Sequence, residues 1–178
     1  FSSDNGPARS PQPVEPELMY DTATGAGWGI GGSKGITAGR KGYKSSLLEG
    51  GINVPFIARW PGRIAADKVV DQSLISAVDL LPTFCELAGA ELPADYQPDG
   101  LSQVAALFGQ AAPERTKPLY WRIDARWPPR PEAPDHWAGF VVVDGRWKLL
   151  TSTDGTHAEL YDLQQDPLEK ADLSDSQL

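Results

Sequence analysis

The chain opens on two adjacent residues with oxygen donors. The first seven residues read FSSDNGP, so Asp4 and Asn5 stand between a short β-like run and the turn residues Gly6 and Pro7. A strand that ends in this way brings a carboxylate and an amide oxygen to the carboxyl edge of a sheet, where open α/β sheets bind ligands. Such hard donors suit Ca²⁺ or Mg²⁺, although two are a fraction of the roughly six to eight that Ca²⁺ takes. An ordinary Asp-Asn-Gly turn is the commoner structure for these residues.

A cationic candidate follows in GRKGYKSSLLEGG, residues 39 to 51. Lys44 stands five residues before Glu49, and Gly50-Gly51 permits a tight turn of the backbone. Residues 1 to 50 hold five acidic and five basic side chains, whereas residues 119 to 178 hold eleven and six. The first part could therefore receive an anion that the acidic end would repel, although a solvated surface lysine is the alternative.

The overall composition excludes several classes of protein. The net charge of −8 without a long basic run argues against a nucleic-acid partner. No apolar run approaches the length of a membrane-spanning segment. A single cysteine, Cys85, excludes an internal disulfide framework, and its helical context predicts a buried thiol. His136 and His157 have no ligand spacing to each other and are interpreted as ordinary surface or packing residues.

The elements that must position these residues begin as a mixed α/β pattern. Residues 1 to 3 indicate the end of a strand, and residues 51 to 62 indicate a mostly buried strand that ends in a Pro61-Gly62 turn. Residues 79 to 90 have helical spacing, with Asp79 as the expected N-cap and Gly89 as the stop. A short amphipathic helix is expected within residues 101 to 109.

The second half of the chain changes to a strand pattern. Asp144-Gly145 between two alternating apolar runs predicts a hairpin, and an antiparallel sheet follows from its neighbours. Asp166, Pro167 and Glu169 resemble the N-cap, N1 and N3 positions of a final helix. The expected strands lie in residues 118–123, 139–152 and 158–163.

Several segments, in order, carry a resemblance to a known family. They are FSSDNGP, KSSLLEGGINVPFIARWPGRI, AVDLLPTFCELAGAELP, DGLS, GRWKLL and ELYDLQQDP. Together they resemble the carboxyl-terminal part of the sulfatase family, the arylsulfatase-like branch of the alkaline phosphatase superfamily. The resemblance runs from Phe1 to about Leu173, and S-D-N-G-P, E-G-G-x-x-V-P and L-Y-D-L-x-x-D-P are its most specific pieces.

The resemblance implies a role for each candidate residue. Asp4 and Asn5 match Ca²⁺ ligands, and Lys44 matches a lysine that contacts the sulfate group, whereas Lys41 matches it only if the alignment shifts. The implied fold is α/β: residues 1–110 end the large mixed-sheet catalytic domain, and residues 111–178 form a small α+β domain with about four antiparallel strands and a terminal helix. The implied substrate is a sulfated carbohydrate or aryl sulfate ester, in a periplasmic, extracellular or lysosomal setting.

One departure from the family pattern is an absence from the sequence. Sulfatases carry a C-x-P-S-R or S-x-P-x-R segment whose Cys or Ser becomes formylglycine, the nucleophile, and no such segment occurs here. The family's amino-terminal pair of metal-binding aspartates and its catalytic histidines are not found either. We therefore assign no catalytic residue within the chain and expect the isolated 178-residue chain to be inactive.

Two other functions stay open at this stage. A phosphoesterase or phosphonate hydrolase of the same superfamily would use similar metal and lysine positions. A non-catalytic carbohydrate-binding module would use exposed aromatic side chains for stacking, although aromatic residues on strands more often belong to a core. The candidates for stacking are Tyr120, Trp121, Trp127 and Trp137.

Overall fold

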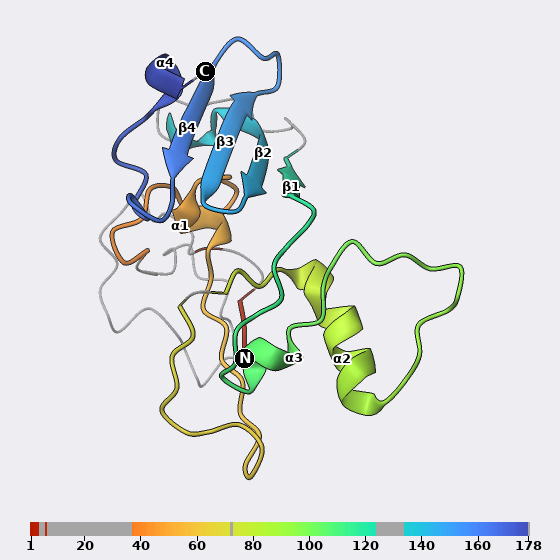
Figure 1. Ribbon diagram of the computed structural model, residues 1–178. Coiled ribbons are helices and arrows are strands. Elements are labelled where there is room, and N and C mark those ends of the chain that lie inside the picture. Colours follow the sequence, from red (N-terminus) through yellow and green to blue (C-terminus); the bar gives the residue numbers. More distant parts are fainter. Residues whose placement is uncertain (4–5, 7–36, 72, 124–133, 178) are drawn as a thin grey trace, which may run out of the picture. The chain divides into compact units, whose positions relative to one another are not determined.

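The computed structural model describes residues 1–3, 6, 37–71, 73–123 and 134–177 (Figure 1). The chain divides into two compact units. The helical unit is Ile57–Leu119 together with Phe1, and the sheet unit is Ser2–Phe56 together with Tyr120–Leu178. The expected boundary between residues 110 and 111 of a catalytic and a carboxyl-terminal domain stays a prediction.

The sheet unit contains a four-stranded antiparallel sheet in the order β1-β2-β3-β4 (Figure 1). Alternation of buried and exposed residues in β2 and β3 fits a sheet with one covered face. This sheet confirms the small α/β domain expected from the sequence. Its strands are β1 (Leu119–Arg122), β2 (Ala138–Asp144), β3 (Trp147–Ser152) and β4 (Ala158–Asp162).

The hairpin between β2 and β3 forms one residue later than its sequence signal suggested. Asp144 pairs with Trp147, so the two-residue loop is Gly145-Arg146 rather than Asp144-Gly145. Gly145 has a φ of 56°, at the first central position of the loop. Arg146, at the second central position, does not have a positive φ, and this combination is typical of a type II′ turn, which suits the twist of a hairpin and favours glycine at its first position.

The end of the chain differs from the expected helix at Asp166. Helix α4 begins at Ser174 (Ser174–Gln177), and Glu169 instead has a φ of 54°, which a right-handed helix does not allow. The Asp166 carboxylate accepts hydrogen bonds from the amides of Lys170 and Ala171, at 2.6 and 2.8 Å. This turn directs the Glu169 side chain into the interior, where it is fully buried.

The helical unit is organised around α2 (Leu80–Ala88), which the 3₁₀ turn η2 (Ala77–Asp79) precedes. Asp79 stands at the N-cap position of α2, as predicted, but its side chain makes no cap hydrogen bond there. It acts instead as the N3 residue of η2, whose N-cap is Ser76, with both contacts of a capping box present. Gly89 ends α2 as predicted, with a φ of 65°. The amide of Gly89 bonds to the carbonyl of Glu86 and that of Ala90 to the carbonyl of Cys85, which is a Schellman motif.

The segment expected as a buried strand, residues 51 to 62, is not one. Helix α1 (Glu49–Ile52) takes its first residues, and Phe56 makes a single antiparallel bridge with Ser2. Phe56 and Ile57 are 41% and 59% exposed. A strand needs a ladder of hydrogen bonds on its flanks, and among the described residues this segment has one bridge. The turn at Pro61-Gly62 does form, with Gly62 at a φ of 79°.

The interior of the helical unit is polar as well as apolar. The Asp79 carboxylate is fully buried, and it accepts hydrogen bonds from the amides of Ser76 and Leu101, each at 2.8 Å. Arg115 completes the site with an Nη2 to Oδ2 distance of 2.6 Å. These contacts join η2, the loop before α3 (Val104–Leu107) and the segment that leads to β1.

Asp154 lies in the loop between β3 and β4 of the sheet unit, and its pKa provides a test of the hydrogen bonds in that loop. Hydrogen bonds from the hydroxyl of Ser152 and from the hydroxyl and amide of Thr156 lower the pKa of Asp154 to about 2. Because the folded pKa is depressed, the stabilisation is present above the ordinary pKa of 3.8 and is lost as the pH falls toward about 2. We expect Ser152→Ala to raise this pKa by about one unit in a carboxyl ¹³C NMR titration. Ser174→Ala, which removes a hydroxyl from a different carboxylate, should leave it unchanged.

Candidate functional site

Helix α1 is a single turn that packs without free space against the segment before it. The amide of Gly50 donates to the carbonyl of Lys41 at 2.6 Å. A Cβ atom on Gly50 would lie 2.2 Å from the carbonyl oxygen of Gly42, and one on Gly51 would lie 2.1 Å from that of Ser46. Such distances allow glycine alone, so the E-G-G sequence exists here to let two backbone segments touch.

The segment packed on α1 carries Lys44 at the corner of a turn. The amide of Ser46 donates to the carbonyl of Tyr43 at 2.9 Å, and Ser45 has a φ of 71°. A positive φ at the third residue of a four-residue turn is typical of type II. Lys44 is exposed, whereas Ser46 and the two leucines after it are buried. The turn therefore presents the ammonium of Lys44 to solvent from a fixed base.

The predicted metal ligands Asp4 and Asn5 lie outside the described residues. Their neighbour Gly6 is described: its amide donates to the carbonyl of Gly51 at 2.7 Å, and a Cβ on it would meet the carbonyl oxygen of Gly50 at 1.9 Å. Helix α1 thus contacts the residue that follows Asn5. Among the described residues, no cluster of three or more His, Cys, Asp and Glu side chains is arranged for a metal ion.

Beneath α1 lies a buried group of three charges that sequence reasoning missed. The Nζ atom of Lys148, on β3, lies 2.8 Å from a carboxylate oxygen of Glu49 and 2.8 Å from one of Glu169. The amide of Glu49 donates to the other oxygen of Glu169 at 2.7 Å. Lys148 and Glu169 are 0% exposed and Glu49 is 6% exposed. Burial raises the pKa of Glu169, and the Lys148 ammonium opposes that rise. We call these three residues the ion triad.

The sequence did hold a signal for the ion triad. In the hairpin that starts at Gly139, Lys148 occupies a position where period-two alternation calls for an inward-facing residue. Its register partners Val143 on β2 and Tyr161 on β4 are buried. A lysine at such a position requires a buried acidic partner, but nothing local indicates which of 24 acidic residues supplies it.

Lys41, the alternative anion contact, is already engaged with the sheet. Its Nζ donates to the hydroxyl of Tyr161 at 3.0 Å and lies 4.0 Å from the carboxylate of Glu159. Tyr161 donates in turn to Glu159, and burial raises the pKa of the Tyr161 hydroxyl. His157 lies on the other side, with its Nε2 3.3 Å from Glu159.

The remaining aromatic and histidine candidates are spread over the sheet unit. Tyr120 is 68% exposed, and Trp121 is half-buried. The Trp137 ring meets the His157 ring edge-on, with centroids 4.4 Å apart. His136 ends the short 3₁₀ turn η3 (Pro134–His136), and Trp127 lies outside the described residues.

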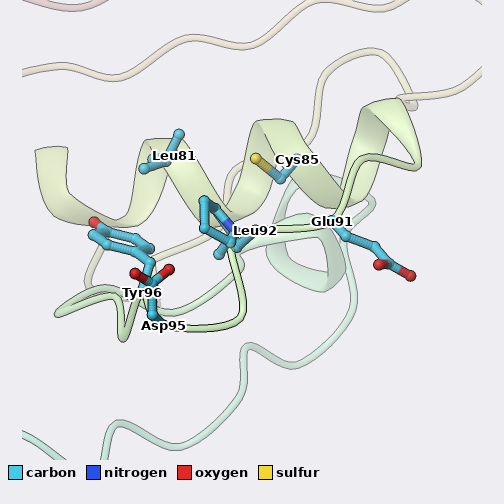
Figure 2. A pocket seen from close by; sticks show the side chains of 7 residues that line it. Leu81, Cys85, Glu91, Leu92, Asp95 and Tyr96 are labelled. Carbon is cyan, nitrogen blue, oxygen red and sulfur yellow. The ribbon is translucent and has the colours of Figure 1, made fainter.

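The helical unit has a groove beside α2 (Figure 2). It has a volume of about 530 Å³, and Cys85 lines it. The thiol is half-buried rather than fully buried as expected, because α2 turns this side toward the loop of residues 91–96. The side chains labelled around the groove are Leu81, Cys85, Glu91, Leu92, Asp95 and Tyr96.

Comparison with known families decides the family of the chain. The model of the N-sulphoglucosamine sulphohydrolase carboxyl-terminal family matches residues 41–177, which include the Lys44 turn, α1 and the whole sheet. The chain belongs to the sulfatase family. The resemblance read from the motifs is confirmed, and the described sheet and helices match the carboxyl-terminal domains of solved sulfatases.

Individual sulfatases agree with this placement. Human arylsulfatase A is 33% identical over 97% of the chain, and the match covers 32% of that relative. The N-acetylgalactosamine-6-O-sulfatase of Bacteroides thetaiotaomicron is 26% identical over 75% of the chain and 26% of the relative. A solved 2-O glycosaminoglycan sulfatase is 29% identical, with a TM-score of 0.52, over 72% of this chain and 26% of that one. The chain thus spans a quarter to a third of the length of these relatives.

A membrane-crossing helix, which needs length and apolarity together, is not found in the described part of the chain.

The close packing of α1 leads to a prediction about glycine. Gly50→Ala should destabilise the sheet unit by about 3 kcal/mol, the upper end of the usual cost of overpacking, because the new methyl group meets two backbone carbonyls. Gly155→Ala is the control: its φ is 73° but its Cβ meets nothing, so we expect a loss of about 1 kcal/mol. Urea denaturation of both variants measures the difference, and equal midpoints would contradict the close contact.

Proposed function

We propose that the chain supplies the sulfate-binding lysine and two Ca²⁺ ligands to a sulfuric ester hydrolase. The proposal is carried by one observation: two segments of the chain, the lysine turn and the residue after Asn5, both contact α1. Gly50 and Gly51 pack directly against the turn that carries Lys44. The carbonyl of Gly51 also accepts a hydrogen bond from the amide of Gly6, the residue that follows Asp4 and Asn5. Family membership supports the reaction class.

Lys44 has the properties that binding of a sulfate ester requires. The ester carries a dispersed negative charge, and negative charge grows on the leaving oxygen as the bond from sulfur to oxygen breaks. Water adds across that bond in the overall reaction, so an alcohol and hydrogen sulfate are formed. The exposed Lys44 ammonium can donate to the sulfate oxygens, and the turn beneath it removes the need to order a flexible loop.

Lys41 is less suited to this role than Lys44. It stands three residues earlier, and its ammonium is bound by the Tyr161 hydroxyl at 3.0 Å. Moving it to a substrate would break that hydrogen bond and expose the hydroxyl. These contacts support the register in which Lys44 is the anion contact.

The donor set of the chain fits calcium in kind. Asp4 offers a carboxylate and Asn5 an amide oxygen, both of the type that Ca²⁺ prefers, and Ca²⁺ would need further oxygen ligands besides these two. When bound, Ca²⁺ supplies positive charge beside the sulfate group. The nucleophile is likewise not assigned to any residue of this chain.

The substrate class that we propose is a sulfated carbohydrate. Two relatives carry sugar-sulfate names, an N-acetylgalactosamine-6-O-sulfatase and a 2-O glycosaminoglycan sulfatase. The acidic sheet unit would repel a polyanion except near the lysine turn, which favours recognition of one sulfate group at a time.

The role of Lys44 is tested in a sulfatase polypeptide that contains these residues. Lys44→Ala should lower kcat/KM for an aryl sulfate by about 10²-fold, the usual effect of removing one preorganised donor. Lys41→Ala is the control for the register and should lower it by about 10-fold or less, because it removes the hydrogen bond to Tyr161 but no contact with the substrate. A large loss with Lys41→Ala alone would move the anion contact to Lys41.

The same polypeptide separates sulfate from phosphate chemistry. We expect kcat/KM for an aryl sulfate to exceed that for the matching aryl phosphate, and Lys44→Ala to reduce the preference. A preference for phosphate or phosphonate esters would favour the other branch of the superfamily.

The metal role of Asp4 has a different signature. Asp4→Ala removes a charged ligand, so activity should fall and should recover in part as Ca²⁺ is added, by mass action. Lys44→Ala should not recover under the same titration, because it removes no metal ligand. Loss of activity with Asp4→Ala that no Ca²⁺ concentration changes would argue against the ligand role.

A further inference from the structure

The position of Lys148 is not explained by packing alone. It is fully buried in the middle of the hairpin strand β3, between Val143 on one neighbouring strand and Tyr161 on the other. A buried ammonium loses its hydration, and an apolar residue at such a site costs less. Both carboxylates that compensate it come from distant segments, Glu49 on α1 and Glu169 in the turn after β4.

We propose that Lys148 is a positioning residue for Lys44: through Glu49 it fixes α1, and α1 fixes the turn that presents the sulfate-binding ammonium. The sulfate part of this inference rests on the proposed function. Lys148 itself is fully buried and takes no part in contact with substrate.

The first link runs from Lys148 to the backbone of α1. The ion pair of Lys148 with Glu49 is 2.8 Å long, and the second oxygen of Glu49 accepts from the side-chain amide of Asn53 at 2.7 Å. The Glu49 carboxylate is therefore held at both oxygens. Because Glu49 is the first residue of α1, holding its side chain and its amide fixes where the helix begins.

The second link runs from α1 to the lysine turn. Gly50 touches the carbonyls of Lys41 and Gly42, and Gly51 touches those of Tyr43 and Ser46, at distances that leave no room for a methyl group. A displacement of α1 toward this segment must move the segment too. Closely packed backbone transmits displacement because it cannot be compressed.

A second anchor lies on the other side of Lys44. The ammonium of Lys41, three residues before Lys44, bonds to the hydroxyl of Tyr161 on β4. Tyr161 is the register partner of Lys148, so both anchors stand on one cross-strand row of the sheet. The turn is thus tied to the sheet before and after Lys44.

Glu169 contacts both Lys148 and the backbone of α1, so it does more than neutralise the buried ammonium. One of its oxygens lies 2.8 Å from Lys148 and the other accepts the amide of Glu49. The ion triad has two carboxylates and one ammonium, which gives a formal charge of −1. Neutralising Lys148 would need only one carboxylate, and burying the second one is unfavourable. The second carboxylate accepts the first amide of α1, which has no partner within the helix.

The experiment compares amide hydrogen exchange in the 178-residue chain and its Lys148→Met variant. We expect exchange at the amides of Gly6, Ser46 and Gly50 to become about 10-fold faster or more, since each donates a hydrogen bond at α1 or at the turn. Amides in the hairpin of β2 and β3 should change by less than about threefold. Lys170→Met, the same change at an exposed neighbour of Glu169, should alter neither group.

Glu169 supplies variants that distinguish positioning from loss of fold. Glu169→Gln keeps an acceptor for the amide of Glu49 and keeps the pair of Lys148 with Glu49, so exchange should stay within about threefold of the parent chain. Glu169→Ala removes the acceptor and should resemble Lys148→Met. If both Lys148→Met and Glu169→Ala leave the turn amides protected, the proposal is wrong.

The kinetic arm uses a sulfatase polypeptide that contains these residues, at saturating Ca²⁺. Lys148→Met should lower kcat/KM for an aryl sulfate by about 10-fold, and in the Lys44→Ala background it should have almost no further effect. Additive losses would overturn the positioning role, since a residue that only supports the fold acts independently of Lys44. If the polypeptide has no sulfatase activity at all, the proposed function fails, while the exchange result still decides whether Lys148 holds the turn.

Discussion

The packing of α1 and of the turn after β4 against the sheet depends on one ammonium group. Lys148 lies fully buried on β3, and two carboxylates from segments 99 and 21 residues away close around it. Removing one partner from such a group typically costs about 3–5 kcal/mol, because the remaining charges stay buried without compensation. The cost makes the arrangement selective: α1, β3 and the turn after β4 can come together in one way. Glu49 and Lys148 lie in the E-G-G and G-R-W-K-L-L motifs, and Glu169 lies two residues after the L-Y-D-L-x-x-D-P motif.

Close backbone contacts at three glycines add to the constraint that the ion triad places on α1. Gly6, Gly50 and Gly51 bring three stretches of backbone within contact distance, and the carbonyl groups there leave no space for a Cβ atom. Charge determines where α1 begins, and the glycines determine how closely its neighbours approach. Together they explain how an exposed lysine on a short turn can have a defined position. The role proposed for Lys44 requires such definition, because a donor aimed at developing charge works only if it is ordered in advance.

The helical unit also has a buried charged group that joins several segments, although the residues differ. Asp79 is fully buried, and it joins the start of η2, the amide of Leu101 and the guanidinium of Arg115. Its apolar side chains are less well covered: Val78, Leu81 and Phe84 on one side of η2 and α2 are 43%, 49% and 57% exposed. Order in the described part of this unit therefore comes from a directional polar centre more than from a large apolar core.

The sequence by itself determined the local features. Period-two alternation identified the hairpin, Gly89 ended α2, and ordered motifs identified the sulfatase family. These are properties of short segments, in which each residue acts on near neighbours. The tertiary structure decided the rest: residues 51 to 62 did not form a strand because a ladder requires partners, and Glu169 left the expected helix because Lys148 and the Glu49 amide bind it from other segments. Which of many acidic residues meets a buried lysine is fixed by the folded chain, since contacts between residues about 100 positions apart leave no periodic pattern in the sequence.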